Sequence, residues 1–124
     1  MSRIATSAIF LTRPYIPADV VSVEDVLIAF SDKVKPTKKG RFWELEKEGS
    51  IFEVDVRKTD CSHFDHEEDF LALDLTVENT PEVITILSNN VSSKTDENFK
   101  FVSTISNEIA KRINGITNGA KISS

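Results

Sequence analysis

The 124-residue sequence predicts an α+β domain in which a four-stranded antiparallel sheet packs against helices on one of its faces. Three observations support this fold. Apolar residues alternate at a spacing of two in some segments and recur at helical spacing in others. These segments follow one another in the order β-α-β-β-β-α-α. Short connections join most of the consecutive strands, which favours antiparallel pairing.

The first strand is expected over residues 3–11, RIATSAIFL, because this segment is rich in β-branched and apolar residues. A loop containing two prolines follows at residues 13–19. Ser22 is then typical of a helix N-cap. An apolar stripe at helical spacing follows it, formed by Val23, Val26, Leu27, Phe30 and Val34. Pro36 is expected to end this helix, because the residue before a proline is disfavoured in the α region.

Residues 41–58 predict a β-hairpin with a two-residue turn at residues 49–50, where glycine supplies a positive φ. This turn places the side chains of Trp43 and Val56 opposite each other on the core face. On the other face it sets four acids opposite one another in two pairs, Glu44 with Asp55 and Glu46 with Glu53. Like charges directly opposite each other destabilise a sheet. The acidic face is therefore expected to be either well solvated or functional.

Alternating leucines predict the last strand at residues 70–79. Thr80 and Pro81 are typical of a helix start and predict a helix over 81–91, although its β-branched residues also fit a strand. A second helix is predicted from Asp96 to Asn114, with Gly115 as the residue that closes it. Residues 1–116 are expected to form a single domain, and residues 117–124 a frayed polar tail.

The net charge of −5 disfavours general binding to nucleic-acid phosphates, which requires a basic surface, and permits binding to a basic partner. A single cysteine cannot form an internal disulfide. No apolar run reaches the length of a membrane span, and the N-terminal segment has no signal-peptide apolar region. These features predict a cytoplasmic protein with no membrane association.

The segment TDCSHFDHEEDF (59–70) contains Cys61, His63 and His66 among five carboxylates. These are possible zinc ligands, with Asp65 as a fourth. Their spacing differs from that of standard zinc fingers, so we predict an acidic loop without a structural metal. The neighbouring carboxylates also oppose formation of a thiolate at Cys61, which argues against a catalytic cysteine.

The sequence contains no phosphate-binding loop, dinucleotide-binding motif or nucleophile elbow. ELEK (44–47) resembles the E-x-K element of metal-dependent nucleases, but the predicted register places Lys47 on the opposite face from Glu44 and Glu46. The basic run KVKPTKKGR (33–41) offers cations for a phosphate or a nucleic acid, but the acidic remainder of the chain favours a solvated loop whose cations complement a helix C-terminus. We therefore predict a protein that is not an enzyme and has no catalytic residue, no metal and no cofactor.

Charge is segregated along the chain, which favours electrostatically guided binding to a basic protein. The residues expected to contact this partner are Glu44, Glu46, Glu53, Asp55, Asp65, Glu67, Glu68 and Asp69. The alternatives are a structural or assembly subunit, a small-ligand-binding domain with a cavity between sheet and helices, and a metal-dependent nuclease.

The size of the chain, the hairpin WELEKEGSIFEVDV and the loop DHEED resemble the small cytosolic immunity proteins of bacterial toxin–immunity pairs. Members of that class cap a cognate toxin, often a basic nuclease, with acidic side chains. The resemblance implies an inhibitor that neutralises a basic toxin domain.

Overall fold

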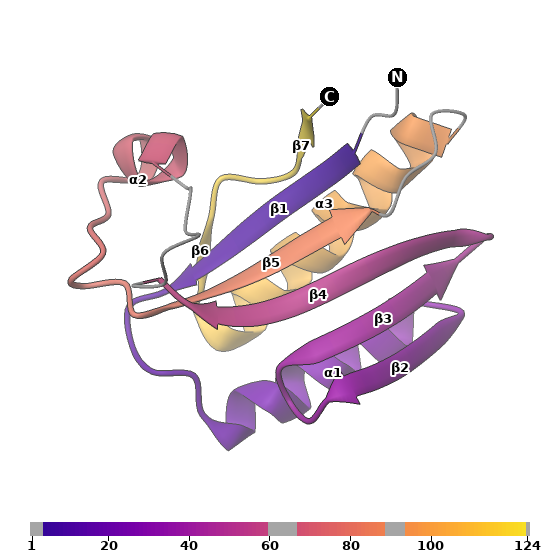
Figure 1. Cartoon of the computed structure of the whole chain (residues 1–124), viewed down its shortest axis with the longest axis horizontal. Coiled ribbons are helices and arrows are strands. Elements are labelled where there is room, and N and C mark those ends of the chain that lie inside the picture. The colour runs from indigo at the N-terminus through magenta and orange to yellow at the C-terminus, as the bar shows by residue number, and fades with distance from the viewer. Residues whose placement is uncertain (1–3, 60–66, 89–93, 124) are drawn as a thin grey trace.

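The computed structural model describes residues 4–59, 67–88 and 94–123 (Figure 1). These residues form a seven-stranded sheet with antiparallel pairing and three helices. The elements are β1 (Ile4–Leu11), α1 (Pro17–Phe30), β2 (Lys33–Lys38), β3 (Phe42–Lys47), β4 (Ser50–Lys58), α2 (Glu67–Leu73), β5 (Glu82–Ser88), α3 (Thr95–Ile113), β6 (Ile116–Thr117) and β7 (Lys121–Ser123). The spatial order is β2-β3-β4-β5-β1-β6, and β7 also pairs with β1. The α+β class is confirmed, whereas the four-stranded sheet and the element order were wrong.

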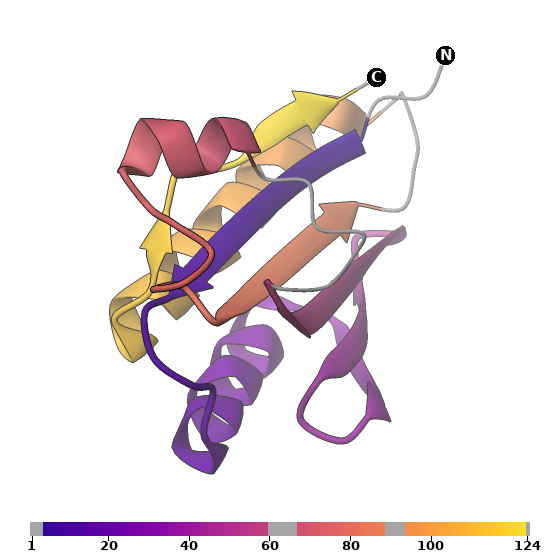
Figure 2. The same ribbon diagram turned by 60° about the vertical axis from the view of Figure 1, so that its left-hand side comes forward.

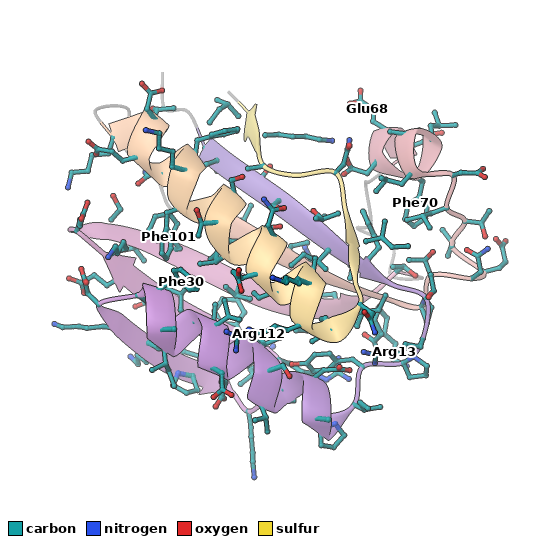
Figure 3. The ribbon with its side chains drawn as sticks, turned by 180° about the vertical axis from the view of Figure 1, so that it is seen from behind. Arg13, Phe30, Glu68, Phe70, Phe101 and Arg112 are labelled. Atoms are coloured by element: carbon teal, nitrogen blue, oxygen red, sulfur yellow. The ribbon has the colours of Figure 1, made fainter. Side chains whose placement is uncertain are left out.

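The sheet carries helices on both faces. Figure 3 shows α1 and α3 lying side by side across one face, and between them and the sheet lies the main core, which includes Trp43, Phe52 and Ile105. On the other face, α2 packs over β1 and β5 through a smaller cluster (Figure 2). Within this cluster the Phe70 ring meets the Phe10 ring edge-on, with centroids 5.2 Å apart. The predicted one-sided packing therefore holds for α1 and α3 but not for α2.

Helix α1 begins and ends earlier than its apolar stripe suggests. Pro17 occupies the first turn, and the Asp19 carboxylate accepts a hydrogen bond from the Ile16 backbone N–H at 2.9 Å. Ser22 lies inside the helix and is not its cap. The helix stops at Phe30, because the segment expected to complete it pairs with β3 as the edge strand β2.

The hairpin of β3 and β4 forms with a different turn. Glu48 and Gly49 have φ values of 50° and 84°, and positive values at both central residues are typical of a type I′ turn. The turn lies one residue earlier than predicted, so Trp43 pairs with Val54 and not with Val56. Moving the turn by one residue shifts the cross-strand partner by two residues. Each side chain stays on its predicted face, because faces alternate with a period of two. The burial predicted for Trp43 is confirmed.

The two segments after β4 exchange their predicted structures. The strand predicted at residues 70–79 was wrong: its first four residues belong to α2 (Glu67–Leu73), in which Leu71 is 79% exposed, and residues 74–79 form no strand. Residues 82–88 form β5, the strand between β4 and β1, and not a helix. A strand enclosed by neighbours and covered on both faces has an apolar run without alternation, which periodicity alone does not distinguish from a buried helix.

Helix α3 is confirmed, and the chain after it is ordered by pairing with β1. Asn114, with φ 56°, takes the left-handed conformation that was expected of Gly115. Gly115 instead provides a close approach, because a Cβ there would lie 2.5 Å from Ile9 Cγ2. The frayed tail expected at residues 117–124 was wrong, since β7 pairs with β1 and the Thr117 hydroxyl donates to the Ala8 carbonyl at 2.8 Å. None of the helices in the described ranges is long and apolar enough to cross a membrane.

Candidate binding surface

The sheet face opposite α1 and α3 presents a group of carboxylates on β3 and β4, which lie in front of the helices in Figure 1. We call this group the acidic face. Its members are Glu44, Glu46, Glu53 and Asp55. Glu44 is exposed and the other three are half-buried. The sequence prediction that these four acids share one face is confirmed, because each alternates with a buried residue of the main core.

The pairs within the acidic face differ from those predicted. Glu44 lies opposite Glu53, whereas Glu46 lies opposite Ile51 and Asp55 opposite Phe42. Asp55 forms an ion pair with Arg57, its Oδ2 lying 3.1 Å from Nε. One acid–acid pair is therefore present, but it joins Glu44 to Glu53. The second expected pair is absent, because Glu46 lies beside the aliphatic side chain of Ile51.

Edge strand β2 adds cations beside the acidic face. Lys33 lies opposite Glu46 and Lys35 opposite Glu44 in the β2–β3 pairing. The sequence prediction interpreted the basic run as a loop. It therefore did not place these two lysines beside the acidic face. No lysine–carboxylate contact here is close enough to be an ion pair. Among the described residues, Glu44, Glu46 and Glu53 form neither ion pairs nor side-chain hydrogen bonds.

The second predicted group of acids does not join the first. Glu67 and Glu68 are exposed on α2, which lies over β1 and β5 and not over β3 and β4. Asp69 is buried and forms an ion pair with Lys121 of β7, so it contributes to packing. Asp65, together with Cys61, His63 and His66, lies outside the described residues, and the prediction that these residues bind no metal stays a prediction.

A small cavity lies on the sheet face that carries α2. It has a volume of about 190 Å³ and is lined in part by Arg57, Asp69, Thr85 and Lys121. Typical sites for small molecules occupy about 300–1,000 Å³. Arg57 already pairs with Asp55, and Lys121 with Asp69. The cavity is therefore a weak candidate for the ligand site that the sequence suggested between sheet and helices, and it lies on the face opposite α1 and α3.

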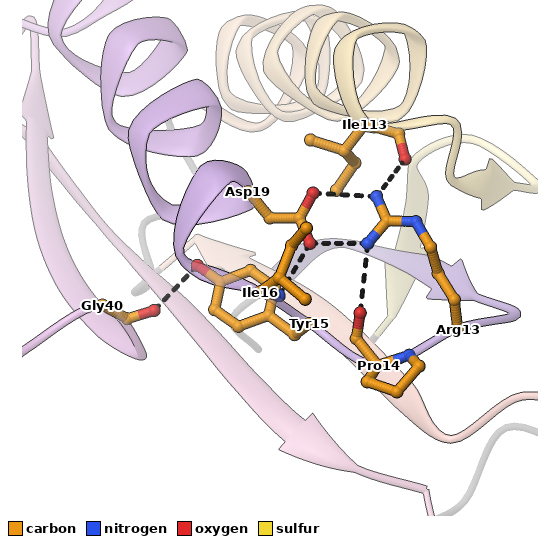
Figure 4. Close-up of polar contacts among 7 residues, drawn as sticks. All are labelled: Arg13, Pro14, Tyr15, Ile16, Asp19, Gly40 and Ile113. Carbon is orange, nitrogen blue, oxygen red and sulfur yellow. Dashed lines mark hydrogen bonds and ion pairs between the residues drawn. The ribbon is translucent and has the colours of Figure 1, made fainter.

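A polar network at the start of α1 fixes the ends of both long helices (Figure 4). The Arg13 guanidinium donates to both carboxylate oxygens of Asp19, at 2.7 and 2.8 Å, and to the Ile113 carbonyl at 2.8 Å. The hydrogen bonds from Arg13 hold the pKa of Asp19 below its usual value. No local sequence signal joins Arg13 to the end of α3, so this network was not predicted.

We expect Asp19→Asn to lower the free energy of unfolding at pH 7 by about 1.5–3 kcal/mol, the range for hydrogen bonds to charged groups. Because the folded-state pKa of Asp19 is lowered, its stabilisation is complete above the unfolded pKa of about 3.9 and disappears as pH falls through the folded pKa. Urea titrations at pH 7, 5 and 3 should show the gap between wild type and variant closing below about pH 4. A gap of the same size at pH 3 would contradict this role.

Comparisons with family models, curated proteins and solved structures found no match to this chain. Its function must therefore be argued from its own side chains.

Proposed function

We propose that this protein acts by binding a basic protein through the acidic face of β3 and β4, without catalysing a reaction. The observation that carries the proposal is the position of Glu44 directly opposite Glu53, with no ion pair to either within the described residues. Such a pair is unfavourable in the free protein, and Lys35, which lies opposite Glu44 on β2, forms no ion pair with it. Cationic side chains of a partner would remove this repulsion and gain charge-assisted hydrogen bonds.

The surroundings of these acids support a protein partner. Ile51 and Leu87 lie next to Glu46 and Glu53 in the strand pairing, and Leu87 is 40% exposed. A surface that mixes apolar side chains with charge resembles the polar rim and apolar centre of protein interfaces. The net charge of −5 would speed encounter with a basic partner at low ionic strength.

Nuclease chemistry is less well supported by the same strands. Lys47 is the residue that would orient a water molecule in an E-x-K element. Its ammonium lies 3.7 Å from Asp32, and its position in β3 turns it to the face opposite Glu44 and Glu46. A lysine on the other side of the sheet cannot act on a metal held by those two carboxylates.

The form of this function that we propose is neutralisation of a basic toxin domain by a cytosolic bacterial protein. It rests on the resemblance of the acidic hairpin to immunity proteins. In that role the acidic face would cover the cationic substrate-binding surface of the toxin. Tight binding would then inhibit the toxin without any chemical step.

Affinity capture from the native host tests the proposal. Wild-type protein should retain one stoichiometric basic partner that is released as salt concentration rises, because exposed ionic contacts are screened. Glu53→Lys should lose this partner. Asp25→Lys makes the same change of charge on an exposed site of α1 and should retain it. Equal capture by both variants would contradict the proposal, as would Mg²⁺-dependent cleavage of nucleic acid that is lost in Glu46→Gln.

A further inference from the structure

A surface groove lies where the start of α1 meets the turn between β2 and β3. Its volume is about 370 Å³, which is within the range of small-molecule sites. Four of its lining residues are apolar or aromatic and two are cations: Tyr15, Ile16, Pro17 and Val20, with Lys39 and Arg41. The groove differs from the acidic face in composition. It combines an apolar wall with two cations, although the net charge of the chain is negative.

Contacts between α1 and the turn fix the walls of the groove. The Tyr15 hydroxyl donates to the Gly40 carbonyl at 2.8 Å (Figure 4). The Arg41 guanidinium lies 5.5 Å from the centre of the Tyr15 ring, a favourable cation–π arrangement. Gly40 itself packs closely on α1, because a Cβ at that position would lie 3.0 Å from Val20 Cγ2. These contacts hold the turn against the helix.

The two cations of the groove are exposed. Arg41 Nη1 lies 3.6 Å from Glu82 Oε2, a buried oxygen that accepts no hydrogen bond. That ion pair is long, and the Arg41 side chain remains 45% exposed and donates no side-chain hydrogen bond to another described residue. Lys39 is exposed and forms no ion pair or hydrogen bond with another described residue. Both cations are therefore accessible to a ligand that enters the groove.

We propose that this groove binds a small amphipathic carboxylate, that is, a carboxylate on a short hydrocarbon chain. The carboxylate would lie at Lys39 and Arg41, where the planar guanidinium can donate two parallel hydrogen bonds. The hydrocarbon part would cover Ile16, which is 46% exposed, together with Pro17 and Val20. Burial of apolar surface drives this half of the contact. The proposal does not depend on the acidic face or on its protein partner.

Isothermal titration calorimetry on the full chain tests the proposal with octanoate as the probe. We expect saturable binding with a stoichiometry of one, weaker binding of the neutral octanamide, and no detectable binding of acetate or inorganic phosphate. Hexanoate should bind roughly three- to tenfold more weakly than octanoate, because two fewer methylenes are partly buried. Octanamide that binds as tightly as octanoate would overturn the role of the cations, and phosphate that binds as tightly would overturn the role of the apolar wall.

Two variants and one matched control locate the site. Lys39→Gln should weaken octanoate binding about two- to fivefold, as expected for an exposed ion pair. Lys38→Gln removes the same charge from the neighbouring residue outside the groove and should have no effect. Ile16→Ser should reduce the advantage of octanoate over hexanoate. Equal losses in the Lys39 and Lys38 variants would show non-specific electrostatic binding and overturn the site. Glu53→Lys should bind octanoate as wild type does. This result would show that the groove acts independently of the acidic face, whether or not the proposed function is correct.

Discussion

Trp43→Ala is expected to lower the free energy of unfolding by about 3–5 kcal/mol, the usual range for truncating a buried tryptophan or phenylalanine. The Trp43 side chain is fully buried between β3 and the helices. Its indole N–H donates to Glu24 Oε1 of α1 at 3.1 Å, so the substitution removes both packing and a contact that joins two layers. Urea unfolding should be followed by circular dichroism, because Trp43 is the only tryptophan.

Two further variants separate the causes of this loss. Trp43→Phe keeps an aromatic ring in the core and removes the hydrogen-bond donor, so it should show a clearly smaller loss of stability than Trp43→Ala. Leu71→Ala removes a side chain that is 79% exposed and should change stability by about 0.5 kcal/mol or less. A loss below about 1 kcal/mol for Trp43→Ala would mean that this side chain does not pack in the core as described.

The hairpin shows which part of a fold local patterning can predict. Alternation assigned Trp43 to the buried face and Glu44 to the open face, and both assignments survive a turn that lies one residue earlier. The identity of cross-strand partners depends on the turn itself. Glu48 takes a positive φ that its residue type does not favour, so the sequence indicated a turn at glycine but not its position.

The exchange between α2 and β5 has a different cause. In residues 67–73, Phe70 and Leu73 are three residues apart and share a helix face that packs on β1, while Leu71 points to solvent. The run of leucines satisfies a period of two equally well. Residues 82–88 lie between two strands and are almost entirely buried, which removes the alternation that would have identified a strand. In both segments, tertiary contacts and not local periodicity determine the secondary structure.

Charge neighbourhoods were the least predictable feature of the candidate site. The four acids were correctly placed on one face because strand alternation is local. The lysines beside them were not, because their position depends on the pairing of β2 with β3. The same limit applies to the groove, which joins Tyr15 of the first loop to Arg41 after β2. A turn on one element and a helix start on another carry no shared pattern in the sequence.

Glu53→Lys is expected to stabilise the free protein and to weaken binding to its basic partner. In the observed register Glu53 lies opposite Glu44, so the substitution converts a like-charge pair into an opposite-charge pair. Such cross-strand pairs contribute about 0.2–1 kcal/mol, and the free energy of unfolding should rise within this range. Urea titration measures this part of the prediction. A fall in stability would contradict the observed pairing.

The effect on binding should be larger and of opposite sign. A lysine at position 53 would face the cations of the partner, and loss of a desolvated charge contact weakens affinity by about 2–5 kcal/mol. This corresponds to a dissociation constant roughly 30- to several-thousand-fold higher. Surface plasmon resonance against the captured partner measures it, with Asp25→Lys as the variant of equal charge on α1. If the acidic face is only solvated, Glu53→Lys would raise stability and leave affinity equal to that of Asp25→Lys. A binding role therefore requires that Glu53→Lys raise the free energy of unfolding and lower the affinity for the partner. The repulsion between Glu44 and Glu53 costs stability in the free protein, and a partner's cations would turn the same two charges into favourable contacts.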